Sequence, residues 1–183
     1  MNKLLIAFIA IPFIVNSQNP DSNIKTFEKF NISNQSIIWQ NVYQRPGMVG
    51  DSLINTINLI IQSDASLSLL GSSDNTFFYE LKDRVFTSGG NLFYGRVRID
   101  FKDDRYRVTI TSITQKIGEK GMRQMDIWAG GTPEAHKLPS SIESTFLNKA
   151  KTDFNKSNLK GLKTINDWFF NAFDFKSTAN DEW

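Results

Sequence analysis

Five side chains near the middle of the chain carry the chemistry needed to bind an anion. Between positions 96 and 111, arginine and threonine alternate with apolar residues, and a period of two places alternate residues on one face of a β-strand. Guanidinium and hydroxyl groups both donate hydrogen bonds to carboxylates. We therefore interpret this face as a candidate docking surface for an acidic peptide or an acidic glycan. Its members are Arg96, Arg98, Arg107, Thr109 and Thr111.

A carboxylate on the same face, Asp100, supports a second interpretation. Arginines that pair with Asp100 would form a solvated face whose role is to keep the protein soluble. Nucleic acid is not an expected partner, because the nearby aromatics Phe101 and Tyr106 alternate onto the opposite face and cannot stack on bases there. The formal net charge of +2 is also too small to indicate nucleic acid or an anionic membrane.

Residues that could perform catalysis are sparse, and we predict that the protein is not an enzyme. The only histidine, His136, lies in a loop flanked by glycine and proline, there is no Gly-x-Ser-x-Gly motif, and there is no cysteine. One histidine cannot build a zinc site, and Asp100, Asp103 and Asp104 are too few for a calcium loop. We therefore expect neither a metal nor a cofactor.

Two alternatives to a binding module stay open. A hydrolase can use two carboxylates that lie far apart in the sequence, and no pattern in the chain singles out such a pair. A purely structural subunit of the cell envelope would instead self-associate through exposed aromatic residues near the end of the chain. The candidates for that contact are Trp168, Phe169 and Trp183.

The element that must position the five side chains is a β-hairpin over 95–113. Apolar and polar residues alternate on both sides of Asp103-Asp104, which we predict to be a two-residue loop. The expected cross-strand pairs are Phe101–Tyr106, Ile99–Val108, Val97–Ile110 and Asp100–Arg107. A slip by one residue would move every apolar side chain into water, so the register is well specified.

Other elements follow from composition and spacing. Strands are expected at 36–44, 76–81, 84–87 and 124–129, with Lys82-Asp83 between the second and third and a turn at 88–91. A helix over 51–62 has leucine and isoleucine at helical spacing and Asp51 as its N-cap. Residues 63–75 are small and polar around three leucines, which predicts a loop and leaves a short strand open.

The C-terminal part is predicted to be helical. Ser140 and Glu143 have the spacing of a capping box, and an apolar stripe runs from Ile142 through Ala150 to Phe173. This stripe fits one long helix or two shorter helices with a break near Asn158. The predicted fold class is α+β, a curved antiparallel sheet in β-α-β-β-β-β-α order with its helices on one face.

The start of the chain predicts export. Lys3 precedes an unbroken apolar run over 4–15, which is long enough for a signal peptide but shorter than the roughly 20 residues of a membrane helix. Cleavage is expected after Ser17, which would give a secreted or periplasmic product with no membrane span. We expect an irregular lead-in over 18–35, one domain over 36–176 and a polar tail over 177–183.

The hairpin residues, preceded by the Arg-Val-Phe-Thr-Ser-Gly-Gly stretch at 84–90, resemble the signature of the DUF4468 family. Members of this family are secreted bacterial proteins with a domain of unknown function and a fold like that of the TATA-box-binding protein (TBP). They similarly begin with a Trp-bearing strand and an amphipathic helix, here 38–43 and 51–62. The resemblance covers roughly 36–114, and the C-terminal helices lie outside its best part.

The resemblance implies a curved antiparallel sheet with helices on its convex face, and it implies no activity. DNA binding by the fold's namesake does not carry over, because a shared fold does not establish a shared function. The chain departs from the family at the turn, where Asp104 stands in place of the usual glycine. A positive φ is less favourable for aspartate than for glycine, so we expect the turn to be wider here than in the family. The expected partner is an unknown protein or glycan of the cell envelope.

Overall fold

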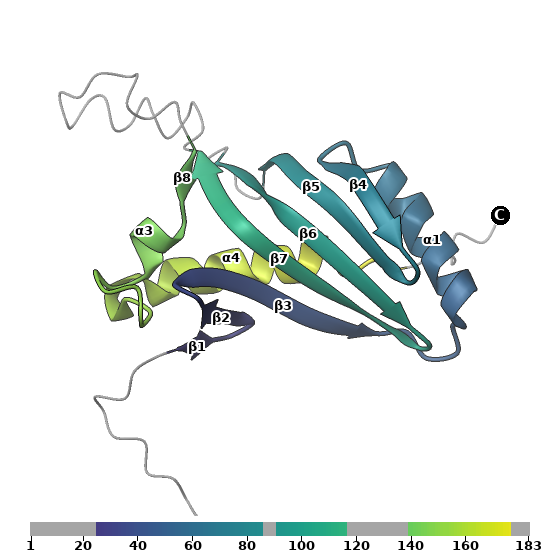
Figure 1. Ribbon diagram of the computed structural model, residues 1–183, viewed down its shortest axis with the longest axis horizontal. Coiled ribbons are helices and arrows are strands. Elements are labelled where there is room, and N and C mark those ends of the chain that lie inside the picture. The colour runs from purple at the N-terminus through teal and green to yellow at the C-terminus, as the bar shows by residue number, and fades with distance from the viewer. Residues whose placement is uncertain (1–24, 86–90, 117–138, 177–183) are drawn as a thin grey trace, which may run out of the picture.

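A single antiparallel sheet dominates the computed structural model, which describes residues 25–85, 91–116 and 139–176 (Figure 1). The predicted leader, the tail at 177–183, the predicted strand at 124–129 and His136 lie outside the described residues. The strands follow the order β1-β2-β3-β7-β6-β5-β4, and β8 pairs with β7. Their bounds are β1 Thr26–Phe27, β2 Phe30–Ser33, β3 Ser36–Gln44, β4 Leu67–Ser73, β5 Thr76–Val85, β6 Leu92–Lys102, β7 Arg105–Lys116 and β8 Ser140–Ser141.

The central hairpin of β6 and β7 has the predicted register. All four expected cross-strand pairs are present, and Lys102 pairs with Arg105 across the two-residue loop. The turn does not widen, although Asp104 has a φ of 61°. Its backbone N–H donates to Met48 O at 3.0 Å and its carboxylate accepts from the Gly47 N–H at 2.7 Å. These contacts with the loop before α1 stabilise a conformation that aspartate tolerates better than most residues do.

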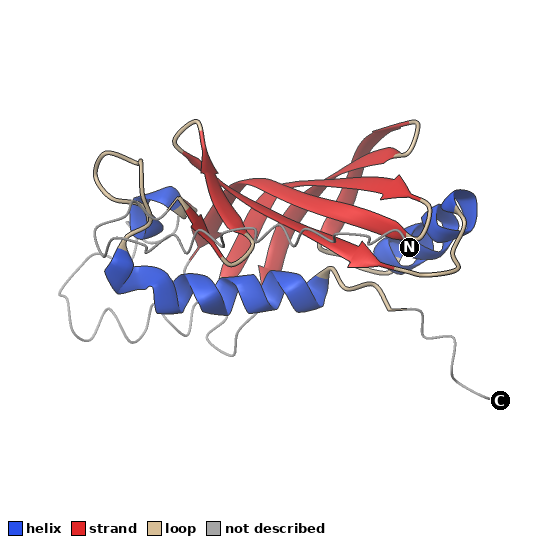
Figure 2. Ribbon diagram, turned by 90° about the horizontal axis from the view of Figure 1, so that it is seen from below, coloured by secondary structure: helices blue, strands red, loops and turns tan. Residues whose placement is uncertain are grey.

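Both long helices, α1 (Gly50–Gln62) and α4 (Leu159–Ala172), pack on the same face of the sheet. Trp39 of β3 is fully buried and donates from Nε1 to Asn166 Oδ1 of α4 at 3.1 Å. Tyr79 of β5 donates from its hydroxyl to Asn58 Oδ1 of α1 at 2.8 Å. Figure 2 shows α4 beneath the sheet, whose two ends bend away from the helix. The predicted α+β class and the one-sided placement of the helices are therefore confirmed.

The N-terminus of α1 is capped differently from the prediction. Val49 occupies the N-cap position and makes no side-chain cap, so Asp51, which lies inside the helix, is not the capping residue. The Asp103 carboxylate of the β6–β7 turn instead accepts from the Gly50 N–H at 3.0 Å. An anion at this end of a helix accepts a hydrogen bond from a free backbone N–H and is attracted by the positive end of the helix dipole. The cap comes from a residue distant in sequence, which local spacing cannot reveal.

Strands also form where irregular backbone was expected. Residues 26–33, within the predicted lead-in, form β1 and β2, because Phe30 is buried against Phe169 of α4 while β2 pairs with β3. Most of 63–75 forms β4, which pairs with β5. The two strands expected on either side of Lys82-Asp83 are one strand, β5, with a bulge between Leu81 and Arg84. A bulge adds residues to a strand without ending it.

The C-terminal part forms two helices with a break that ends at Asn158, the second of the two predicted alternatives, but the capping box predicted at Ser140 is wrong. Ser140 belongs to β8, and α3 (Glu143–Phe146) is a single turn whose Glu143 carboxylate accepts from the Ile37 N–H at 2.8 Å. Residues 147–155 are irregular, and a 3₁₀ turn (Lys156–Asn158) precedes α4. Asparagine side chains explain the interruption: Asn148 Oδ1 accepts from the Thr152 N–H at 3.0 Å, which competes with helical hydrogen bonding. Ala150, expected in the apolar stripe, is exposed.

Aromatic residues proposed for self-association belong partly to the core. Phe169 is fully buried beneath the sheet, and Trp168 packs against Phe93 with ring centroids 5.9 Å apart. Neither side chain is therefore presented as an exposed contact surface, and Trp183 lies outside the described residues.

Candidate functional site

The face of the sheet opposite the helices, called the open face below, holds all five predicted binding side chains. Cross-strand pairing sets them in rows, with Glu80, Arg96 and Thr111 in one row across β5, β6 and β7. The next row contains Phe78, Arg98, Thr109 and Gln40, and the third contains Thr76, Asp100, Arg107 and Val42. Because neighbouring strands are about 4.8 Å apart, side chains within a row are close neighbours.

A groove of about 660 Å³ lies on the open face along β4, β5, β6 and β7. Four of the five predicted side chains line it: Arg96, Arg98, Thr109 and Thr111. Leu70 of β4 and Phe78 of β5 line the same groove, and their exposed fractions are 58% and 41%. The groove therefore offers cationic groups, hydroxyl groups and an apolar surface to one ligand.

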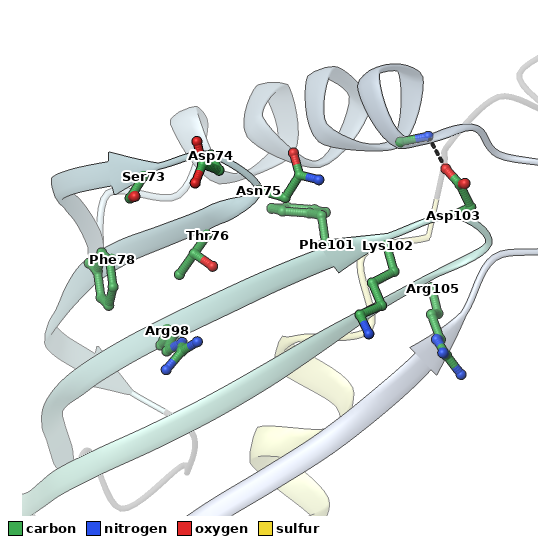
Figure 3. Close-up of a pocket in the computed structure, with 11 residues that line it drawn as sticks. Ser73, Asp74, Asn75, Thr76, Phe78, Arg98, Phe101, Lys102, Asp103 and Arg105 are labelled. Atoms are coloured by element: carbon green, nitrogen blue, oxygen red, sulfur yellow. Dashed lines mark hydrogen bonds between the residues drawn. The ribbon is translucent and has the colours of Figure 1, made fainter.

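A second groove of about 820 Å³ adjoins the first, because Arg98 and Phe78 line both (Figure 3). It adds Lys102 and Arg105, whose side chains lie along the β6–β7 hairpin in Figure 3. A smaller hollow of about 170 Å³, lined by Lys102, Arg105 and Arg107, continues towards β3. The cationic surface thus extends from Arg96 to the tip of the hairpin.

Asp100 is the carboxylate around which two of the arginines are arranged. It lies 2.7 Å from Arg98 Nη2 and 2.9 Å from Arg107 Nη2, and it accepts from the Thr76 hydroxyl at 3.0 Å. Burial alone would raise the pKa of Asp100, but the hydrogen bonds from Arg107, Arg98 and Thr76 outweigh burial and lower that pKa below its usual value. Asp100 therefore stays ionised at neutral pH and neutralises one of its two arginines.

Three further cations of the open face have no carboxylate partner in the described part of the chain. Among the described residues, no acidic group lies within 4.0 Å of the charged groups of Arg96, Lys102 or Arg105. Glu80, which pairs with Arg96 in the register of β5 and β6, forms its ion pair with Lys82 at 2.8 Å instead. The open face consequently has a local excess of positive charge.

Apolar members of the site were not predicted from the sequence. Phe78 had a usable signal in the sequence, because strand alternation places it on the same face as the charged Glu80 and opposite Phe77 and Tyr79. Leu70 had no such signal. It lies at the register shift between Leu69 and Gly71, which breaks the alternation of β4.

The described residues provide little for metal or hydrolytic chemistry. They contain no group of three or more His, Cys, Asp or Glu that could hold a metal ion. Asp74 and Asp103 both line the second groove, but they belong to different turns and lie apart in Figure 3. Asp103 also accepts the hydrogen bond from Gly50. No helix in the described part of the chain is long and apolar enough to cross a membrane.

The fold is that of the TBP-like proteins, a bent, unclosed antiparallel sheet with helices on one side. A crystal structure of a DUF4468 family protein from Bacteroides ovatus ATCC 8483 is similar over 84% of this chain and 94% of that chain, with a TM-score of 0.51 and 14% identity. A TBP-like protein from Parabacteroides distasonis ATCC 8503 is similar over 82% of this chain and 97% of that chain, with a TM-score of 0.50 and 15% identity. No protein-family model and no curated protein matches the sequence.

These two structural neighbours agree with the resemblance found in the sequence. At 14% and 15% identity they establish the fold, and they assign no activity to it.

Proposed function

We propose that the protein is a non-catalytic binding or assembly module of the bacterial cell envelope that holds an acidic protein or glycan on its open face. One observation carries this proposal: five cationic side chains border adjoining grooves on the open face, and Asp100 forms ion pairs with two of them. The five are Arg96, Arg98, Lys102, Arg105 and Arg107. A cationic concave surface attracts and orients an anionic partner.

The exposure of the arginines favours binding over a purely solubilising role. The side chains of Arg98 and Arg107 are 51% and 45% exposed even though both contact Asp100. One carboxylate occupies only part of the hydrogen-bonding capacity of two guanidinium groups, since each guanidinium has five N–H donors. Phe78 adds an apolar surface beside Arg98, as is typical of specific binding sites.

Binding can be measured with two defined carboxylated polymers, poly-L-glutamate and polygalacturonate, using fluorescence anisotropy. We expect the double variant Arg96→Ser/Arg98→Ser to lose at least about tenfold in affinity, because ligand contacts to both guanidinium groups disappear. Lys149→Ser/Lys160→Ser is the matched control, since it removes the same charge from exposed positions outside the open face. Equal losses in the two double variants would show only an effect of net charge and would refute the proposal.

Export by the N-terminal leader is part of the proposal. The support is the apolar run over 4–15 with small residues before position 18. Expression of the full chain in a bacterial host, followed by fractionation and mass spectrometry of the intact protein, tests it. We expect a product that begins at Gln18 outside the cytoplasm. An uncleaved chain in the cytoplasm would contradict this part of the proposal.

A further inference from the structure

Strand β4 forms an edge of the sheet that lacks most of the usual protection against strand pairing. In an antiparallel sheet, alternate N–H and C=O groups of an edge strand point away from their only neighbour. Exposed edges are commonly blocked by charged residues, proline, short length or a bulge. Over seven residues, β4 has no charge and no proline, and its one irregularity is the shift at Leu70. At the opposite edge, β1 has two residues and is followed by Glu28 and Lys29.

Side chains along this edge are exposed on both faces of the sheet. Leu69 pairs with Tyr79 and points to the side of α1, while Leu70 lines the groove of the open face. Their exposed fractions are 59% and 58%, so no described segment covers either leucine fully. A strand placed beside β4 would contact both leucines.

The two sides of an added strand would meet different chemistry. On the helix side, a small cavity of about 80 Å³ is lined by Leu69, Phe77, Tyr79 and residues of α1, and it suits a small apolar side chain. On the open side, the groove beside Leu70 contains Arg96 and Arg98, which suit a carboxylate. Successive residues of a strand point to opposite faces, so these preferences alternate along the added strand.

We infer that the β4 edge binds an extended peptide segment in which apolar and acidic residues alternate. The backbone of the segment would pair with β4, the apolar side chains would pack towards α1, and the acidic side chains would reach the arginine groove. The acidic half of this pattern rests on the proposed function of the open face. A second copy of the chain fits less well, because β4 has no carboxylate to offer the arginines of its partner.

The test uses a labelled peptide of alternating valine and glutamate, seven residues long, and the intact exported chain in a fluorescence anisotropy titration. Two further peptides carry N-methyl groups on every valine or on every glutamate. Because only one edge of the added strand pairs with β4, one methylated peptide should lose at least about tenfold in affinity and the other should not. Equal behaviour of the two methylated peptides would overturn the inference.

A pair of variants tests the position of the edge. Leu69→Lys should reduce peptide affinity at least about tenfold, because it places a charge at the edge. Leu59→Lys is the control, since Leu59 is 69% exposed on α1 and does not belong to β4. Equal effects of the two substitutions, or self-association that Leu69→Lys abolishes, would refute a peptide site at β4.

Failure of this inference can be told apart from failure of the proposed function. If Arg96→Ser/Arg98→Ser weakens poly-L-glutamate binding while both methylated peptides bind like the parent peptide, the open face binds anions and β4 binds no strand. If the arginine variant binds every acidic probe as tightly as the original chain, the proposed function fails as well. In that case the predicted alternation of acidic residues is also wrong.

Discussion

Replacing Asp100 by asparagine separates the two roles that the arginines of the open face can have. If the arginines bind an anionic partner, Asp100 competes with that partner for Arg98 and Arg107. If they only keep the protein soluble, Asp100 forms ion pairs with them in water and competes with no ligand. Asp100→Asn removes one negative charge and keeps the size of the side chain. It should lower stability under both interpretations. It should strengthen anion binding only if the arginines bind a partner.

The loss of stability follows from the contacts of Asp100. Its ion pairs with Arg98 and Arg107 involve guanidinium groups that are about half exposed, so each contributes no more than about 0.5 kcal/mol after screening by solvent. The Thr76 hydroxyl donates to a charged oxygen in the original chain and to a neutral amide oxygen in Asp100→Asn, which costs up to about 1 kcal/mol more. A total of about 1–2 kcal/mol corresponds to a decrease in Tm of about 2–8 °C for a chain of this size.

The pH dependence of this loss has a defined sign. The folded-state pKa of Asp100 is lowered, so its contribution to stability is fully present above the unfolded pKa of about 4. The contribution disappears as the pH falls through the lower, folded-state pKa. The Tm difference between the original chain and Asp100→Asn should therefore be constant from about pH 5 to pH 7 and should shrink in more acidic solution.

The gain in binding follows from the removed charge. A ligand carboxylate about 7 Å from Asp100 is repelled by about 0.6 kcal/mol in water, so Asp100→Asn should bind poly-L-glutamate about threefold more tightly at low salt. Asp167→Asn on α4 is the control, because it makes the same change in net charge at a half-exposed position on the other side of the sheet. Unchanged or weaker binding by Asp100→Asn, together with the expected decrease in Tm, would refute the claim that these arginines serve a partner.

Two further substitutions test the framework that positions the open face. Asp103→Ala should lower the free energy of unfolding by about 1 kcal/mol in urea titrations, because it removes the carboxylate that caps α1 at Gly50. Asp51→Ala should lower the free energy of unfolding clearly less. Equal decreases would contradict the assignment of Asp103 as the cap. Trp39→Phe should cost about 1–3 kcal/mol in the same assay, because a smaller ring replaces the fully buried indole and Asn166 Oδ1 keeps only its hydrogen bond from the Lys29 N–H. An unchanged urea midpoint would contradict this.

The central hairpin could be predicted because the information that determines it is local. The alternation of apolar and polar residues on both sides of Asp103-Asp104 specifies the register without reference to any other strand. The same alternation places Lys102 and Arg105 on the open face beside Arg98 and Arg107. Both could therefore have been added to the candidate site from the sequence alone, by applying the rule that had already selected its other members.

The length of strand β4 could not be predicted because its own residues carry no alternation, although its pairing with β5 across the turn at 74–75 is local. Its sequence contains a glycine and several serines, and the register shift at Leu70 removes the alternation that identifies a half-buried strand. The strand forms because β5 presents an edge with which it pairs. For the same reason, the groove between β4 and the arginines was not predicted, since half of its lining comes from β4 and β5.

Charge counted along the sequence underestimates the charge that the fold gathers on one surface. The segment 96–107 contains five cations and the three carboxylates of Asp100, Asp103 and Asp104, which suggests a nearly neutral hairpin. In the structure, the carboxylate of Asp103 binds the N–H of Gly50, the first residue of α1, and that of Asp104 binds the N–H of Gly47 in the preceding loop. Of the three carboxylates, only that of Asp100 contacts the arginines, so the open face becomes cationic because its turn residues cap a neighbouring element.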